Sequence, residues 1–129
     1  MQISVINFSE EDHQVVCSTQ HGLLRGKWCS DVIPLLHHDY EVEIDIPQVI
    51  TQQELICSDD GTENIKCERD FIRLSALVIE QDDNTLTLSL NGDICIVEVD
   101  STVRESSYLN ERVVIQVDEI HFYEIGIGF

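Results

Sequence analysis

Apolar and polar residues alternate with a period of two along much of the chain. The clearest case is 39–46, where four acids alternate with four apolar residues: Asp39, Glu41, Glu43 and Asp45 between Tyr40, Val42, Ile44 and Ile46. Successive side chains of a strand point to opposite faces, so this pattern predicts a strand with one apolar face and one row of carboxylates. We expect the apolar face to lie on the core and the acids to face solvent.

Similar patterns predict most of the other elements. In 85–90 three leucines alternate with hydroxyl residues, and the following Asn91-Gly92 favours a tight type I′ hairpin. Residues 48–55, after Pro47, are expected to form a short helix, and 58–64 a polar, exposed turn. The segments expected to be strands are 3–8, 14–17, 23–28, 40–46, 71–80, 86–90, 94–99, 113–117 and 121–127.

Many short strands with brief connections predict an all-β fold with at most one or two short helices. The 129 residues suit a single domain spanning 1–129. Either a small antiparallel barrel, OB-like in outline, or a β-sandwich satisfies the pattern. The barrel is favoured because a long strand at 71–80, a hairpin at 86–99, an irregular connection at 101–110 and closing strands at 113–127 fit it.

The chain is strongly acidic, with 25 Asp and Glu against 7 Lys and Arg and a formal net charge of -18. Such a surface attracts cationic partners and repels nucleic acid and anionic lipid. Direct nucleic-acid binding is not expected, because few basic side chains are present to contact phosphates. The acidity has a second interpretation, in which it serves solubility or adaptation to salt.

The sequence predicts a cytoplasmic protein with reduced thiols. It has five cysteines, an odd number, and its first residues lack the basic and apolar regions of a signal peptide. No apolar run approaches the ~20 residues that span a bilayer, so no membrane association is expected.

No recognisable catalytic, cofactor or metal motif is present. His37-His38-Asp39 lacks a further Cys or His at a zinc-site spacing, and neither a nucleophile elbow nor a phosphate-binding glycine loop occurs. We therefore expect a protein that is not an enzyme and needs no cofactor, metal or small-molecule substrate. An enzyme with an unfamiliar site is the alternative.

The candidate residues for binding a partner are mostly acidic. Trp28, beside Arg25 and Lys27, is either a core residue or an exposed anchor of the kind enriched at interfaces. The full candidate set is Asp39, Glu41, Glu43, Asp45, Trp28, Glu80, Asp82 and Asp83.

With the acid-lined strand 39–45 and the further acids Glu80, Asp82, Asp83, Glu98 and Asp100, the chain resembles acidic immunity proteins of bacterial toxin systems, such as contact-dependent growth inhibition and other polymorphic toxins. The resemblance covers the chain in outline, and it implies an intracellular inhibitor that plugs the active site of a cationic nuclease toxin. It assigns no contact residues.

Physical chemistry supports the same expectation, because a nuclease must be cationic where it holds phosphates. Glu41 and Glu43, central in the row, are then expected to bond to Lys, Arg or His of the toxin. The competing interpretation is a non-catalytic structural or assembly module of a larger complex. Such a module would dock through an apolar surface, for example residues 125–129, and its charge would serve solubility.

Overall fold

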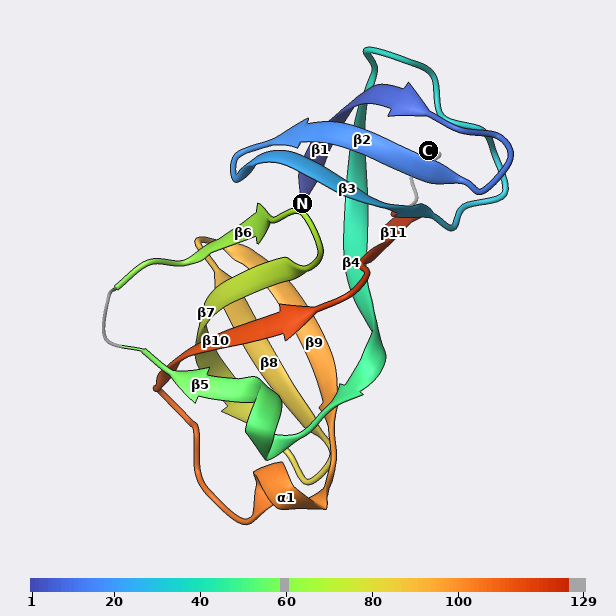
Figure 1. The fold of residues 1–129 in the computed structure, drawn as a ribbon. Coiled ribbons are helices and arrows are strands. Elements are labelled where there is room, and N and C mark those ends of the chain that lie inside the picture. The colour runs from blue at the N-terminus through green and yellow to red at the C-terminus, as the bar shows by residue number, and fades with distance from the viewer. Residues whose placement is uncertain (59–60, 126–129) are drawn as a thin grey trace.

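The computed structural model describes residues 1–58 and 61–125 and consists mainly of strands (Figure 1). Strands make up 59% and helices 6%, which confirms the all-β class, and five strands close a barrel with other strands outside it. The elements are β1 (Gln2–Phe8), β2 (Gln14–Thr19), β3 (Gly22–Trp28), β4 (Asp39–Ile50), η1 (Gln52–Glu54), β5 (Leu55–Cys57), β6 (Asn64–Cys67), β7 (Ile72–Gln81), β8 (Thr85–Leu90), β9 (Asp93–Val99), α1 (Ser101–Arg104), β10 (Arg112–Val117) and β11 (His121–Glu124).

The closed ring consists of β1, β2, β3, β11 and β4. Each of these strands is hydrogen-bonded to the next, and β4 returns to β1 through the pairs Gln2–Glu41 and Ser4–Asp39. All of these pairings are antiparallel except that of β3 with β11. Buried apolar side chains from every strand of the ring, among them Val5, Val15, Leu24, Val42 and Phe122, contribute to the core.

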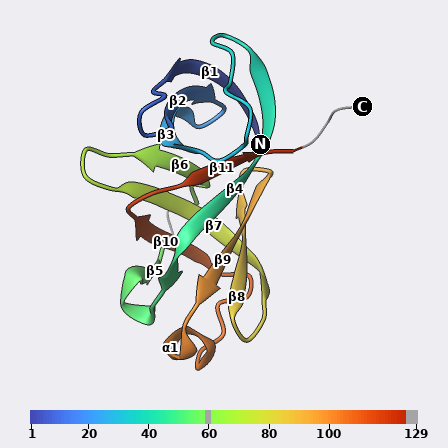
Figure 2. The same ribbon diagram turned by 90° about the vertical axis from the view of Figure 1, so that its right-hand side faces the viewer.

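The remaining strands extend the sheet beyond the ring. The lower half of β4 pairs in parallel with β9, and the order continues through β8, β7 and β10 to β5, while β6 pairs with β7. The long strand β4 therefore belongs to both the ring and the open sheet (Figures 1 and 2). The segments 71–99 and 113–117, which the sequence assigns to an OB-like barrel, form the open sheet instead, and only β11 joins the ring.

The predicted hairpin at Asn91-Gly92 is confirmed. Both residues have positive φ, 55° and 96°, as a type I′ turn requires. The three leucines of β8 are fully buried, whereas its hydroxyl residues are partly exposed. This turn also contacts the ring, because Gln20 Nε2 donates to Asp93 Oδ2 (2.6 Å) and His21 Nε2 lies 2.8 Å from the same oxygen.

The helix predicted over 48–55 is wrong. Strand β4 runs through Pro47 to Ile50, and only the single turn η1 follows. Pro47 is tolerated because the pairing of β4 with β9 shifts register between Asp45 and Val49, where no ladder hydrogen bond needs its missing N–H. Exposed Val49 and buried Ile50 continue the alternation of the strand, which outweighs the helix-start signal of the proline.

Several boundaries also differ from the prediction. The strands β5 and β6 were not predicted, and β6 takes the end of the expected turn at 58–64, of which residues 59–60 lie outside the described part. Strand β11 ends at Glu124, and the expected strand residues 126–127 lie outside the described part too. The irregular connection 101–110 contains α1, whose first turn is capped by Asp100 Oδ1 accepting from the Thr102 N–H (2.9 Å).

No helix in the described residues is long and apolar enough to cross a membrane.

Candidate functional site

The acidic row, Asp39, Glu41, Glu43 and Asp45, lies on the exposed face of β4 as predicted. All four side chains are exposed, whereas the intervening Val42, Ile44 and Ile46 are at most 4% exposed. The pairing of β4 with β1 and β9 on one edge and with β11 on the other holds its backbone in place. The carboxylates are therefore displayed from a fixed strand rather than from a loop.

The structure places the upper two acids of the row beside a cleft. Asp39 and Glu41 line a hollow of about 630 Å³ between β1 and the β8–β9 turn, together with Asp93. The Met1 amino group lies 3.4 Å from Glu41 and 3.9 Å from Asp93, and it donates to the Val42 carbonyl (2.8 Å). Part of the charge of Glu41 is thereby already compensated within the chain.

The lower two acids, Glu43 and Asp45, lie between β9 and β11. Across β11, Tyr123 is opposite Glu43 and His121 is opposite Asp45. The His121 Nε2 lies 3.0 Å from Glu119 Oε1, which is outside the row. Within residues 1–58 and 61–125, no Lys or Arg forms an ion pair with either acid. These two carboxylates are available to a partner.

The negative charges of Glu43 and Asp45 contribute to raised pKa values of neighbouring groups. Burial raises the pKa of the Cys95 thiol to about 12, and the Asp45 and Glu43 charges add to the effect. The pKa of the Tyr123 phenol is also raised, first by the charge of Cys29 and a hydrogen bond with it, and to a smaller extent by Asp45. Both shifts favour the protonated, neutral form at pH 7, so the acids are the charged groups of this surface.

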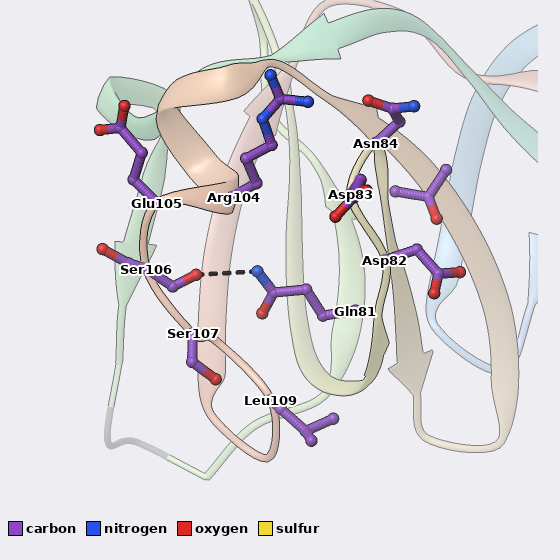
Figure 3. Close-up of a pocket in the computed structure, with 10 residues that line it drawn as sticks. Gln81, Asp82, Asp83, Asn84, Arg104, Glu105, Ser106, Ser107 and Leu109 are labelled. Atoms are coloured by element: carbon purple, nitrogen blue, oxygen red, sulfur yellow. Dashed lines mark hydrogen bonds between the residues drawn. The ribbon is translucent and has the colours of Figure 1, made fainter.

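The other predicted acids do not gather around the row. Glu80 shares its face, because the register runs from Glu80 to Thr87, Ile96 and Asp45, but three strand spacings, about 14 Å, separate the two carboxylates. Asp82 and Asp83 lie at the β7–β8 turn and line a different hollow, about 800 Å³, with Arg104 (Figure 3).

Figure 3 shows how the walls of this second hollow are joined. The Gln81 side chain extends from the end of β7 and donates to the Ser106 carbonyl (2.9 Å). Its Oε1 also accepts from the N–H of Tyr108, which is not drawn (2.7 Å). These bonds tie the β7–β8 turn to the connection after α1. Gln81 therefore has a structural role there.

The expectation that Trp28 is an exposed anchor is wrong, because its side chain is only 1% exposed. Its indole packs edge-on against Tyr40, with ring centroids 5.2 Å apart, and Nε1 donates to the Val32 carbonyl (2.8 Å). Tyr40 in turn accepts a hydrogen bond from the Leu35 N–H (2.8 Å). Trp28 thus packs in the core and supports the connection between β3 and β4.

Two groups of exposed aliphatic residues were missed by the sequence reasoning. One is the connection just described, where Val32, Ile33, Leu35 and Leu36 are 48–69% exposed. The other is Ile94 and Ile96 on β9, 49% and 54% exposed. The sequence of β9 contains a signal, because Cys95, Val97 and Val99 occupy its buried face and isoleucines still occupy the opposite one.

The described residues contain no cluster of three or more His, Cys, Asp or Glu able to hold a metal ion. Their surface chemistry is that of carboxylates and aliphatic side chains displayed from strands, which suits protein binding. Comparison with protein-family models, curated proteins and solved structures finds no match to this chain.

Proposed function

We propose that this protein is an inhibitor that binds a cationic protein through the acidic row of β4, most specifically a nuclease toxin that it neutralises as an immunity protein. The single observation that carries the proposal is the exposed pair Glu43 and Asp45, which has no basic partner among the described residues and sits on a strand fixed at both edges. Repulsion between neighbouring carboxylates does not stabilise the fold. A role in binding would explain why the row is present.

The electrostatics suit rapid inhibition of a basic enzyme. A net charge of -18 steers a cationic protein toward the acidic face, and steered association reaches about 10⁸–10⁹ M⁻¹s⁻¹ at low salt. Because strand pairing already fixes the backbone of β4, bonding of its carboxylates to Lys or Arg orders only the side chains. The same groups compete with the phosphates that a nuclease must hold.

A second candidate is a structural or assembly module. The observation that favours it is the exposed aliphatic connection 32–36, which Trp28 and Tyr40 hold in place. This function predicts an association that depends on apolar contact and is insensitive to salt. Ile125 is also 50% exposed, but residues 126–129 lie outside the described part of the chain.

The first test is affinity capture from a lysate of the source organism on three immobilised proteins. These are the wild type, the double variant Glu43→Gln/Asp45→Asn, and the matched control Asp82→Asn/Asp83→Asn, which loses the same charge at the distant β7–β8 turn. Capture is compared at ~50 mM and ~0.5 M salt, where the Debye length shrinks to about 4 Å. Each basic protein retained is purified and assayed for cleavage of plasmid DNA and of RNA.

We expect the wild type and the control to retain one basic protein at low salt and the row variant to lose it. We further expect the wild type to abolish the nuclease activity of that protein. Equal loss on both variants would assign the effect to net charge and overturn the role of the row. Retention only of a salt-resistant assembly without nuclease activity would overturn the inhibitor and favour the structural module.

A further inference from the structure

The outward face of β9 is apolar where a solvent-exposed strand ordinarily carries polar groups. Ile94 and Ile96 are about half exposed, although the other face of the same strand already supplies Cys95, Val97 and Val99 to the core. Exposed aliphatic residues that adjoin each other mark interaction sites more often than scattered ones do. β9 therefore displays more apolar surface than its packing requires.

Carboxylates surround these two isoleucines. Asp45 is the direct neighbour of Ile96 on β4, one strand spacing or about 4.8 Å away, and Glu43 precedes it on the same face. Glu98 follows Ile96 along β9, and Glu80 closes the far side beyond Thr87 of β8. Beside Glu98, on β4, Val49 adds another half-exposed aliphatic side chain. We call this surface the isoleucine face.

We infer that the isoleucine face docks a basic segment of a protein that presents aliphatic side chains between Lys or Arg residues. This inference rests on the proposed function and specifies its partner. An apolar centre with a charged rim is the usual anatomy of a protein interface, in which the centre supplies affinity and the rim supplies orientation and rate. The acidic row accordingly does not act as a purely polar copy of a phosphate backbone.

Charge excludes the other occupants of such a face. A second copy of the chain, stacked on the same face, would place Glu43, Asp45 and Glu98 against the same carboxylates of the other copy, and this juxtaposition of like charges is unfavourable. Nucleic acid and anionic lipid are repelled for the same reason. A basic partner with apolar side chains satisfies both the centre and the rim.

The inference is tested with two synthetic peptides of equal length and charge, one alternating Lys with Leu and the other Lys with Ser. Each is titrated into the ¹⁵N-labelled full chain, and amide shifts are followed by NMR. The protein variants are Ile94→Thr/Ile96→Thr, which keeps β-branched residues in the strand, and the control Ile56→Thr/Leu109→Thr, which removes equally exposed aliphatic residues elsewhere. Thermal unfolding of each variant confirms that it is folded.

We expect the Lys-Leu peptide to bind the wild type about tenfold more tightly than the Lys-Ser peptide, with shifts centred on Ile94, Ile96 and Asp45. The isoleucine variant is expected to abolish this preference, and the control to keep it. Equal affinity of the two peptides for the wild type, shifts centred elsewhere, or no saturable binding at about 1 mM would overturn the isoleucine face.

These outcomes are separable from the toxin hypothesis because they require no toxin. Capture of a basic nuclease that depends on Glu43 and Asp45, together with equal binding of the two peptides, would leave the proposed function standing and remove the apolar centre. Preference for the Lys-Leu peptide without any captured nuclease would support the isoleucine face and count against the nuclease-inhibitor function.

Discussion

Glu63 joins the start of β6 to the β8–β9 hairpin and to β10. Its Oε1 accepts from the Asn91 N–H (3.2 Å) and from Ser89 Oγ (3.3 Å), and its Oε2 accepts from Arg112 Nη1 (2.9 Å). The pKa of this carboxyl is lowered below its ordinary value of 4.5, mainly by the hydrogen bond from the Asn91 N–H and to a smaller extent by Arg112. The charged form is therefore favoured by folding.

The pKa of Glu63 is lower in the folded protein than in the unfolded chain, so its ionised form stabilises the fold above pH ~4.5. This stabilisation is lost as the pH falls through the folded-state pKa. We expect Glu63→Gln to lower the free energy of unfolding by about 1 kcal/mol at pH 7. We also expect the difference from the wild type to shrink as the pH falls below ~4.5 and Glu63 becomes protonated in the folded state. Urea unfolding across this pH range measures both effects.

The exposed Glu10, in the turn after β1, offers a control that removes one charge without removing these contacts. The Glu10→Gln variant should follow the wild-type pH dependence. A Glu63→Gln variant that parallels the wild type at every pH would show that the carboxylate is not anchored as described.

At the level of elements, β3 and β11 approach so closely that only glycine fits between them at position 26. A Cβ added to Gly26 would lie 2.5 Å from Phe122 Cε2 and 2.7 Å from the Ile120 carbonyl oxygen. One of these contacts is with backbone, which has little freedom to move because Lys27 N–H donates to the same carbonyl (2.9 Å). This close approach at Gly26 lies where β3 and β11 pair within the ring.

We expect Gly26→Ala to destabilise the protein by about 1–3 kcal/mol, because the added methyl group must push the two strands apart. Thermal unfolding monitored by circular dichroism measures the change. The exposed Lys27→Ala on the same strand serves as the control and should shift the midpoint far less. A Gly26→Ala protein that melts with the wild type would contradict the close packing of β3 and β11.

The elements that sequence reasoning found are those with a strong local pattern. The acidic strand, the alternating leucines of β8 and the Asn91-Gly92 turn each specify their own conformation, and the structure has them all. The helix over 48–55 was predicted wrongly because proline is common in the first turn of a helix. A bulge in a sheet accommodates proline equally well. The bulge depends on β9, which no local pattern reveals.

The exposure of the acids on β4 could be predicted from the sequence, but the residues beside them on other strands could not. Alternation alone places Glu43 and Asp45 on the outer face of a strand. The proximity of Ile96 and the distance to Glu80 depend on which strands pair and in what register, and several registers satisfy the same alternation. Trp28 was ambiguous because a tryptophan beside basic residues fits both a core and an interface.

For the whole molecule, the charge of -18 predicts that salt stabilises the fold. Four of the acids lie in a row on the exposed face of β4, and the repulsion between them falls as the Debye length shortens. We expect the melting temperature to rise by a few degrees between ~0.02 and ~0.3 M sodium chloride, which differential scanning calorimetry measures. The Glu43→Gln/Asp45→Asn variant should melt no lower than the wild type and respond less to salt; a melting temperature that falls with salt would contradict this.

The closed ring has a consequence for how the protein is made. Its first three strands come from residues 2–28, but the ring is completed only when β11 inserts between β3 and β4, as in the bond from the Glu124 N–H to Ser30 Oγ across 94 positions. Until residue 124 has left the ribosome, β3 and β4 each keep an unpaired edge. Charged side chains, Arg25 and Lys27 on β3 and the acidic row on β4, oppose the pairing of those edges with other chains in the meantime.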